Sequence, residues 1–169
     1  RSSDLVALAF HAGAPVADLE FVQFHPTALR LPDTPCFLIT EAVRGEGGVL
    51  RNAHTDRFMP AYHPQAELAP RDVVARSVLL EMLKTGSDHV YLDLSLLSPE
   101  LIKHRFPNIY ETCLSYGLDI TKAPIPVAPA AHYMMGGVAT DLYGRTGLPH
   151  LFACGEVANS GVHGANRLA

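Results

Sequence analysis

Runs of apolar residues, broken by prolines and glycines, divide the chain into short elements. The apolar run 5–14, closed by Gly13, predicts a short buried helix, since glycine commonly ends helices. The β-rich run 19–24 predicts a strand that stops before Pro26, because proline cannot donate a backbone hydrogen bond. A polar turn between apolar residues in 49–57 predicts a short hairpin.

Stronger helix signals follow in the middle of the chain. Apolar residues recur at helical spacing in 72–83, and Gly86 marks the expected end of that helix. Residues 90–94 have the composition of a strand. Ser98, which precedes Pro99, is the expected N-cap of one helix, and Asn108, which follows Pro107, is the expected N-cap of the next.

The segment 123–129 contains three prolines, which predicts an extended connector rather than a central strand. We place a domain boundary there. After it, the glycine-flanked runs 136–140 and 151–155 predict two short strands. The chain therefore mixes helix and strand along its whole length.

Size and charge narrow the class of protein. The chain has 169 residues, 48% of them apolar, which is enough for a hydrophobic core in one domain, or in one domain and part of another. Thirteen Lys and Arg against seventeen Asp and Glu give a net charge of −4. The basic residues are scattered, so we expect no nucleic-acid partner.

The apolar runs, the cysteines and the two ends of the sequence indicate where the protein works and whether the chain is part of a longer one. No apolar run approaches the roughly 20 residues that cross a bilayer, and residues 1–4 do not open a signal peptide, so we expect no membrane insertion. Cys36, Cys113 and Cys154 form no CxxC pair; we interpret them as reduced, mostly buried thiols of a cytoplasmic protein, and we expect no metal site. The start without methionine, and the helix-like opening at 164–169, predict a piece of a longer protein.

The densest group of polar side chains is the segment 40–48, Thr-Glu-Ala-Val-Arg-Gly-Glu-Gly-Gly. It follows an apolar run and places Glu41 and Arg44 beside three glycines. This pattern is typical of a short helix whose end delivers polar groups to a cleft. The alternative is a solvated helix end with a glycine-rich turn, and this segment alone leaves both open.

Four basic side chains lie in places where a polar residue is unexpected. His25 follows an apolar strand, and His132 lies between uncharged residues. Arg71 opens a helix, where the macrodipole disfavours a cation, and Arg167 lies among small residues. Singly, such a histidine is usually a satisfied core residue and such an arginine is usually solvated. Together they favour a shared small dianion, such as a dicarboxylic acid, because arginine binds carboxylates bidentately.

Six motifs, in order along the chain, resemble the succinate dehydrogenase/fumarate reductase flavoprotein family. Their order and their coverage of nearly the whole chain make the resemblance specific. The motifs are residues 24–27, 40–48, 71–76, 132–137, 155–158 and 163–168.

The resemblance implies an α+β fold. Residues 37–129 would be the capping domain of that family, and residues 1–36 and 130–169 would be incomplete pieces of its Rossmann-like FAD-binding domain. In the family, the capping domain closes over a dicarboxylate stacked on FAD. The sequence contains no GxGxxG segment of the kind that holds the ADP half of FAD, so we predict that this chain alone binds FAD weakly or not at all and is inactive.

The resemblance also implies roles for individual residues. Arg71 would transfer a proton at a substrate carbon while hydride passes to or from FAD, and Glu41 and Arg44 would connect Arg71 to solvent. Because a free guanidinium has a pKa above about 12, we favour an electrostatic role for Arg71 over a role as a base. The substrate carboxylates would be held by His25, Thr40, His132 and Arg167, and FAD by Gly155 and Glu156.

Within the family, residues 40–48, 90–93 and 160–169 favour members that oxidise L-aspartate to iminoaspartate for NAD biosynthesis, with oxygen or fumarate as electron acceptor. The partners implied are a dicarboxylate (L-aspartate, fumarate or succinate) and, as a pathway neighbour, quinolinate synthase. Exposed flanks predict self-association. Two alternatives stay open: a piece of a fumarate reductase or succinate dehydrogenase flavoprotein subunit, and a non-catalytic capping module.

Overall fold

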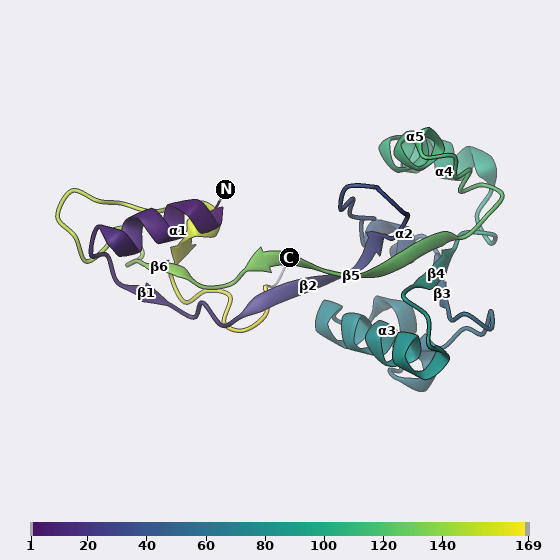
Figure 1. The fold of residues 1–169 in the computed structure, drawn as a ribbon, viewed down its shortest axis with the longest axis horizontal. Helices are drawn as coiled ribbons and strands as arrows, with labels where there is room; N and C mark the ends of the chain where they lie inside the picture. The colour runs from purple at the N-terminus through teal and green to yellow at the C-terminus, as the bar shows by residue number, and fades with distance from the viewer. Residues whose placement is uncertain (1, 168–169) are drawn as a thin grey trace. The chain divides into compact units, whose positions relative to one another are not determined.

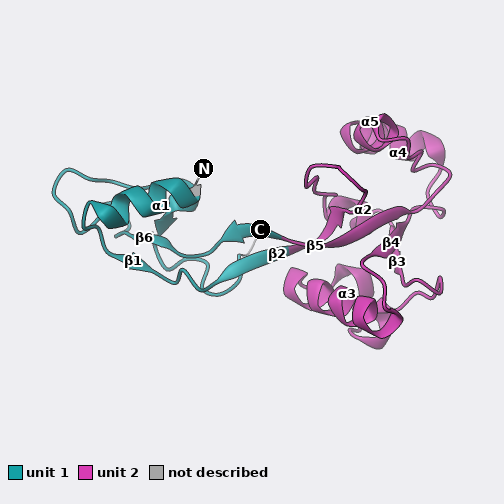
Figure 2. Cartoon of the chain, in the orientation of Figure 1, with its two compact units in different colours: residues 1–24, 131–169 teal, residues 25–130 magenta. Residues whose placement is uncertain are grey.

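The computed structural model describes residues 2–167. Two compact units make up the chain: unit 1 contains residues 1–24 and 131–169, and unit 2 contains residues 25–130 (Figure 2). The divisions thus fall after residues 24 and 130, whereas the family resemblance places them after residues 36 and 129.

Unit 2 contains most of a four-stranded sheet with the strand order β2-β5-β4-β3 (Figure 1). Its strands are β2 (Val22–Leu29), β3 (Val49–Arg51), β4 (Val90–Asp93) and β5 (Ile125–Met134). Strand β4 is antiparallel to both β3 and β5. The helices of unit 2 are α2 (Ala42–Gly45), α3 (Arg71–Thr85), α4 (Pro99–Arg105) and α5 (Pro107–Ser115), with 3-10 turns η1 (Met59–Ala61) and η2 (Ala66–Leu68).

The main hydrophobic core lies in unit 2. Val90 and Leu92 are buried on β4, while the residues between and after them are half-buried, as the two-residue period of a strand requires. Val74 and Val78 of α3 and Ile102 of α4 join the same buried cluster. Burying each such side chain contributes about 1.5–3 kcal/mol, so this cluster stabilises the frame that carries the polar residues.

Several local predictions for unit 2 are confirmed. Helix α3 ends at Gly86, which adopts the left-handed conformation with φ 65°. Ser98 caps α4, because its hydroxyl accepts the Leu101 amide at 3.2 Å. The hairpin at 49–57 forms, and the Asn52 side chain holds its turn by accepting two backbone amides. Capping residues and turn residues act locally, which is why the sequence predicts these features.

Two predictions about prolines are wrong. Strand β2 does not stop before Pro26 but runs on to Leu29. Segment 123–129 does not stay outside the sheet, because β5 begins at Ile125 and lies between β2 and β4. Strand β2 is at the sheet edge, where a missing donor is tolerated.

The register explains how a proline-rich segment forms the central strand β5. Ile125 pairs with Leu92 and Val127 pairs with Val90, so these residues bond toward β4. Pro126 faces the other way, and its carbonyl accepts the Arg30 amide at 2.8 Å. The donor that Pro126 lacks is therefore missing on the β2 side, and the pairing with β4 is complete.

Two further boundaries differ from the prediction. Asn108 lies inside α5, which starts at Pro107, instead of capping it. The run 151–155 is not a strand: only Phe152 forms an isolated bridge there, and a 3-10 turn, η3 (Gly155–Val157), follows. Glycine at position 155 has φ 73°, which ends extended structure and begins the turn.

Unit 1 has a small three-stranded sheet with the order β1-β6-β7. Its elements are α1 (Ser2–His11), β1 (Val16–Ala17), β6 (Gly137–Ala139) and β7 (Ala158–Asn159), with η3 before β7. Helix α1 confirms the predicted helix but not its burial, because Leu5, Leu8 and Phe10 are 53%, 66% and 59% exposed. The predicted helix opening at 164–169 extends beyond the described residues.

The cysteines are free, as predicted, but they are not mostly buried. Cys113 is buried in α5, and burial raises the pKa of its thiol to about 11. Cys36 and Cys154 are exposed, because both lie in loops between regular elements. Among residues 2–167, no helix is both long and apolar enough to cross a lipid bilayer.

Candidate active site

The segment 40–48 forms a single helical turn, α2, that is stopped by glycine. The Thr40 hydroxyl accepts the Ala42 amide at 3.4 Å at its start. Gly47 has φ 115°, and a Cβ on Gly48 would lie 2.8 Å from the Val43 carbonyl oxygen. The chain can therefore reverse tightly here only with glycine, which leaves Glu41 and Arg44 on a short, fixed element.

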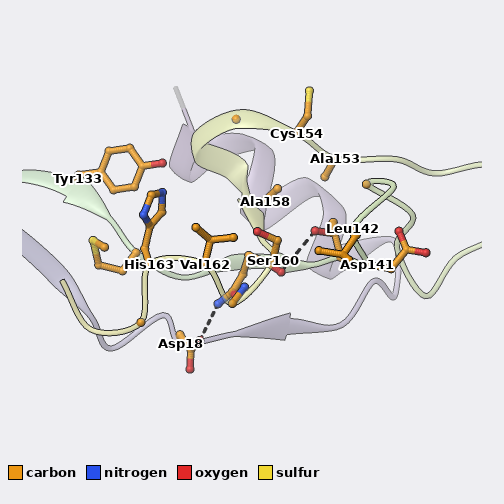
Figure 3. Close-up of a pocket in the computed structure, with 17 residues that line it drawn as sticks. Asp18, Tyr133, Asp141, Leu142, Ala153, Cys154, Ala158, Ser160, Val162 and His163 are labelled. Carbon is orange, nitrogen blue, oxygen red and sulfur yellow. Dashed lines mark hydrogen bonds between the residues drawn. The ribbon is translucent and has the colours of Figure 1, made fainter. Parts of the chain in front are cut away.

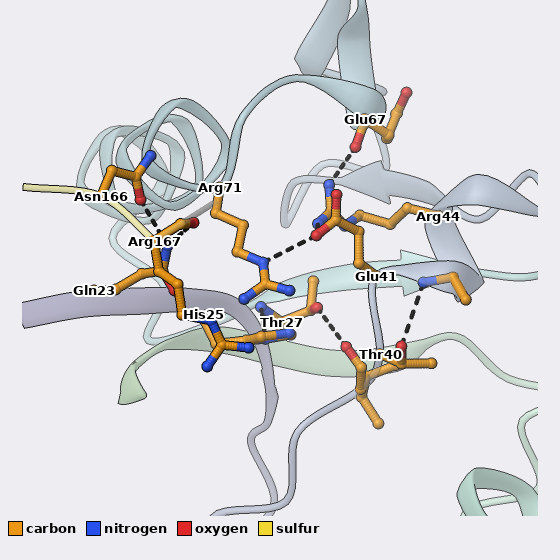
Figure 4. A network of polar contacts seen from close by, with 12 residues as sticks. Gln23, His25, Thr27, Thr40, Glu41, Arg44, Glu67, Arg71, Asn166 and Arg167 are labelled. Atoms are coloured by element: carbon orange, nitrogen blue, oxygen red, sulfur yellow. Dashed lines mark hydrogen bonds and ion pairs between the residues drawn. The ribbon is translucent and has the colours of Figure 1, made fainter. Parts of the chain in front are cut away.

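Glu41 joins two arginines that come from different elements (Figure 4). Its Oε2 atom accepts a hydrogen bond from Nε of Arg71 at 2.9 Å and lies 3.8 Å from Nη2 of Arg44. Arg71 is the first residue of α3, where the helix dipole disfavours a cation, so the Glu41 carboxylate offsets that cost. The structure thus brings together the three residues predicted to carry the proton chemistry.

Arg44 is the buried member of this network. Its side chain is 0% exposed, whereas those of Arg71 and Glu41 are 20% and 42% exposed. Nη1 of Arg44 donates to the backbone carbonyl of Glu67, but its buried Nε and Nη2 have no hydrogen-bond partner among the described residues. Burial lowers the pKa of Arg44, as does the nearby Arg71, while Glu41 and Glu67 oppose this shift.

The sequence did not indicate that Glu67 has a role. Its carboxylate is 5% exposed and accepts two hydrogen bonds from Arg57, at 3.0 and 2.6 Å, and one from the Leu50 amide at 3.2 Å. Burial alone would raise the pKa of Glu67, but these hydrogen bonds lower it overall. The only sequence signal is a carboxylate four residues before Arg71, and nothing local pairs it with Arg57.

His25 and Thr40 lie on neighbouring segments of unit 2. His25 is buried, and its Nδ1 accepts the Thr27 amide at 3.2 Å, which places the ring proton of a neutral imidazole on Nε2. Thr27 also holds the segment before Thr40: its hydroxyl donates to the Ile39 carbonyl, and its carbonyl accepts the Ile39 amide, both at 2.9 Å. The strand β2 thereby fixes the approach to segment 40–48.

In unit 1, His132 and Glu156 line one pocket of about 430 Å³, together with Tyr133. Arg167 lies over the ring of Tyr133, with its guanidinium carbon 4.5 Å from the ring centre. Nε2 of Gln23 donates to the carbonyl of Arg167 at 3.0 Å and so anchors this end of the chain. Tyr133 thus connects three of the predicted residues of unit 1, because it lines the pocket with His132 and Glu156 and lies beneath Arg167.

A second pocket of unit 1, of about 330 Å³, is lined by Gly155 and the glycine-rich residues 160–164 (Figure 3). Gly161 and Gly164 have positive φ and open space where a Cβ would stand, so a flat ligand can approach their backbone. Glu156 lines the pocket with His132 and not this one, and its carboxylate can accept hydrogen bonds from ligand hydroxyls there. Open glycine backbone suits a flat ring such as that of a flavin, and a carboxylate suits a hydroxyl-bearing chain such as the ribityl group.

The predicted residues divide between the two units. Unit 2 contains His25, Thr40, Glu41, Arg44 and Arg71, and unit 1 contains His132, Gly155, Glu156 and Arg167. In the described part of the chain, no cluster of three or more His, Cys, Asp or Glu side chains could hold a metal ion.

Comparison with known proteins identifies the family. The model of the FAD binding domain family matches residues 2–169. The chain belongs to this family. Membership confirms FAD as the cofactor of the family to which the chain belongs.

Relatives in this FAD binding domain family carry more specific names. The chain is 55% identical over 169 residues to a protein named L-aspartate oxidase from Pseudomonas aeruginosa, covering 100% of the chain and 31% of that protein. It is 54% identical over 171 residues to one of the same name from Streptomyces coelicolor, covering 99% and 30%. The chain thus spans about a third of the length of these relatives.

Among solved structures, the chain resembles the quinol fumarate reductase of E. coli with a TM-score of 0.88 at 40% identity, covering 99% of this chain and 31% of that one. It resembles the Sdh1 complex of Mycobacterium smegmatis with a TM-score of 0.74 at 42% identity, covering 98% and 28%. The fold is therefore that of the FAD-binding domain in fumarate reductase and succinate dehydrogenase flavoproteins, with mixed helix and sheet.

Proposed function

We propose that the complete protein is an FAD-dependent oxidase that converts L-aspartate to iminoaspartate, and that this chain carries part of its active site. The observation that carries the proposal is the Arg71–Glu41–Arg44 network on segment 40–48. Relatives named L-aspartate oxidase are 54–55% identical to the chain, against 40–42% for the fumarate reductase and Sdh1 structures, which supports aspartate as the substrate.

The reaction removes two hydrogens from L-aspartate: a hydride from Cα and a proton from nitrogen, and the proton would pass to solvent. Bound FAD would take up the electron pair with the hydride and pass it on to oxygen or fumarate. When fumarate is the acceptor, one of its olefinic carbons gains a hydride and the other gains a proton. We assign delivery of that proton to Arg71, which Glu41 holds in a fixed orientation and which would regain a proton from solvent through Glu41 and Arg44.

The other predicted residues bind the substrate. Nε2–H of His25 and the exposed hydroxyl of Thr40 can donate hydrogen bonds to a carboxylate. We assign these two, with His132 and Arg167 of unit 1, to the two carboxylates of the dicarboxylate substrate. Arg71 and Arg44 also stabilise negative charge that develops on the substrate, which requires no deprotonated arginine.

The proposal also covers the capping domain, the cellular compartment and the pathway of the enzyme. We propose that residues 37–129 act as the capping domain over the substrate and that the enzyme works in the cytoplasm. Its product would serve NAD biosynthesis, with quinolinate synthase as the next enzyme. These assignments rest on the family resemblance and on the names of the relatives.

A substrate comparison tests the proposal on the full-length protein. We expect FAD-bound enzyme to oxidise L-aspartate and to leave succinate essentially unoxidised. Faster oxidation of succinate would instead favour a fumarate reductase or succinate dehydrogenase flavoprotein, the alternative that the TM-score of 0.88 supports. Absence of bound flavin and of any turnover would favour a non-catalytic capping module.

Replacing Arg71 separates its two possible roles. Lysine keeps the positive charge but not the planar guanidinium that meets Glu41. We expect Arg71→Lys in the full-length enzyme to lower kcat by about 100-fold or more. An unchanged kcat would show that the guanidinium geometry is not required.

For the 169-residue chain by itself, we predict weak or no FAD binding, because its sequence contains no GxGxxG segment. A titration followed by flavin absorbance measures this. A yellow protein with nearly stoichiometric flavin would contradict the prediction.

A further inference from the structure

Glu67 is connected to both arginines of the Arg71–Glu41–Arg44 network, to Arg44 by a hydrogen bond and to Arg71 along the chain. Its backbone carbonyl accepts the hydrogen bond from Nη1 of Arg44. Four residues further along the chain, Arg71 opens α3, after the buried Ala69 and the exposed Pro70. The position of Glu67 therefore sets where the Arg44 guanidinium is held and where the chain delivers Arg71.

Arg44 depends strongly on this one carbonyl. Among the described residues, its buried Nε and Nη2 have no hydrogen-bond partner, and Glu41 Oε2 lies 3.8 Å from Nη2. A side chain that is 0% exposed cannot replace a lost bond with bulk water. If the Glu67 carbonyl moves, the Arg44 guanidinium moves with it or loses its one hydrogen-bond acceptor among the described residues.

The Glu67 side chain is itself fixed from two directions. Arg57 donates two hydrogen bonds to its two carboxylate oxygens, and the Leu50 amide of β3 donates a third. Bidentate arginine–carboxylate pairs fix both distance and plane. The residue lies in η2, a single short turn with little rigidity of its own, so side-chain anchoring determines its position.

We propose that Arg57 and Glu67 are positioning residues: their ion pair holds the Glu67 carbonyl in place and thereby orients Arg44 and, through residues 68–70, Arg71. This inference rests on the proposed function, because it assigns the pair to the same reaction. Neither residue touches the substrate in this role. Their effect falls on the rate of the chemical step and leaves substrate binding unchanged.

The test compares three variants of the full-length enzyme. Arg57→Gln removes the ion pair, and we expect kcat to fall about tenfold with KM unchanged, as small displacements of catalytic groups do. Arg57→Lys keeps one contact to Glu67 and should recover part of kcat. The matched control is Arg51→Gln in the same hairpin. It removes the 2.7 Å ion pair of Arg51 with Asp93 of β4 and the hydrogen bond of Arg51 to the Thr55 carbonyl, but neither contact involves Glu67, so this variant should keep the wild-type kcat.

Melting temperatures and a crystal structure complete the test. Arg57→Gln and Arg51→Gln should lower the melting temperature similarly, while only Arg57→Gln should lower kcat and displace Arg44 from the Glu67 carbonyl. Wild-type kcat in Arg57→Gln, or an undisplaced Arg44 in its crystal structure, would overturn the inference. If Arg57→Gln fails to fold, wild-type kcat and an undisplaced Arg44 in Arg57→Lys overturn it instead.

The test of the Arg57–Glu67 pair can fail or succeed independently of the test of the proposed function. The ratio of variant to wild-type kcat is measured with whichever dicarboxylate the wild-type enzyme turns over, so a preference for succinate overturns the aspartate assignment alone. If the wild-type enzyme turns over none, the proposed function fails, and the crystal structure still decides whether Arg57 positions Arg44.

Discussion

The two units of the chain differ in where their apolar side chains lie. In unit 2, residues such as Leu50, Val78 and Leu92 are completely buried in one cluster. In unit 1, Leu8 of α1 and Phe152 near η3 are 66% and 64% exposed. Unit 2 therefore has a core of its own, whereas unit 1 presents the kind of apolar surface that other protein normally covers.

The polar groups follow the same division. Unit 2 places its charges in fixed ion pairs anchored to buried backbone, as at Arg44 and Glu67. Unit 1 gathers polar groups around pockets lined by glycine and half-buried side chains. A rigid frame suits a network whose geometry matters for chemistry, and an open, glycine-lined surface suits the approach of a large flat cofactor.

The largest expected effect contrasts the cores. Leu92→Ala in the 169-residue chain should lower the free energy of unfolding by about 2–5 kcal/mol, because it leaves a cavity in unit 2. Leu8→Ala in α1 should change it by less than about 0.5 kcal/mol, because that side chain is already exposed. Urea titration followed by circular dichroism measures both. Equal losses would mean that unit 1 has a core as well packed as that of unit 2.

The next effect concerns the buried carboxylate. Glu67→Gln should cost about 2 kcal/mol at pH 7, since a charged acceptor is replaced by a neutral one. The folded state lowers the pKa of Glu67 below its usual 4.5, so its contribution is complete above that pH and is lost as the pH falls through the lowered value.

Unfolding free energies between pH 7 and pH 3 check this prediction. Wild-type and Glu67→Gln chains should converge as the pH falls. Glu100→Gln, at an exposed position in α4, serves as the control and should shift stability by less than about 0.5 kcal/mol throughout. A constant gap between wild type and Glu67→Gln would contradict the assigned pKa shift.

A smaller effect is expected at the helix cap. Ser98→Ala removes the acceptor for the Leu101 amide and should lower the free energy of unfolding by about 1 kcal/mol. Ser160→Ala, at an exposed loop position of unit 1, should change it by less than about 0.5 kcal/mol. Thermal unfolding measures the melting temperatures of both variants. An equal decrease in the two would show that the Ser98 cap adds no stability beyond that of an ordinary surface serine.

The last prediction needs no substitution and compares how fast the three cysteine thiols react with a labelling reagent. At pH 8, a thiol reagent should modify the exposed Cys36 and Cys154 quickly, while Cys113 reacts only on unfolding because burial raises its pKa to about 11. Mass spectrometry of the native chain gives the count. Rapid modification of Cys113 would show that α5 opens readily.

Local signals explain what the sequence could predict. Gly86 and Ser98 end or begin helices through their own backbone and side chains, so α3 and α4 could be located without neighbours. Segment 40–48 could be singled out because its charges and glycines are adjacent in sequence. The Arg71–Glu41 pair was reached through the family resemblance.

Features that depend on a partner strand or a distant residue could not be predicted this way. Whether Pro126 breaks a sheet depends on which side its missing donor faces, and that follows from the register with β4. The burial of Cys113 and the exposure of Cys36 depend on packing that residue type alone does not fix. The Arg57–Glu67 pair joins two residues that share no local pattern.

The prolines of β5 have a mechanical consequence for the sheet. Pro126 lacks a donor on the side that faces β2, so at this position β5 only accepts a hydrogen bond, from the Arg30 amide that follows β2, and donates none. One backbone hydrogen bond is therefore absent here, which lowers the free-energy cost of separating the two strands at this end. Strand β2 also carries His25, so the strand that positions this histidine is joined to β5 with one hydrogen bond fewer than a residue with a backbone donor at position 126 would allow.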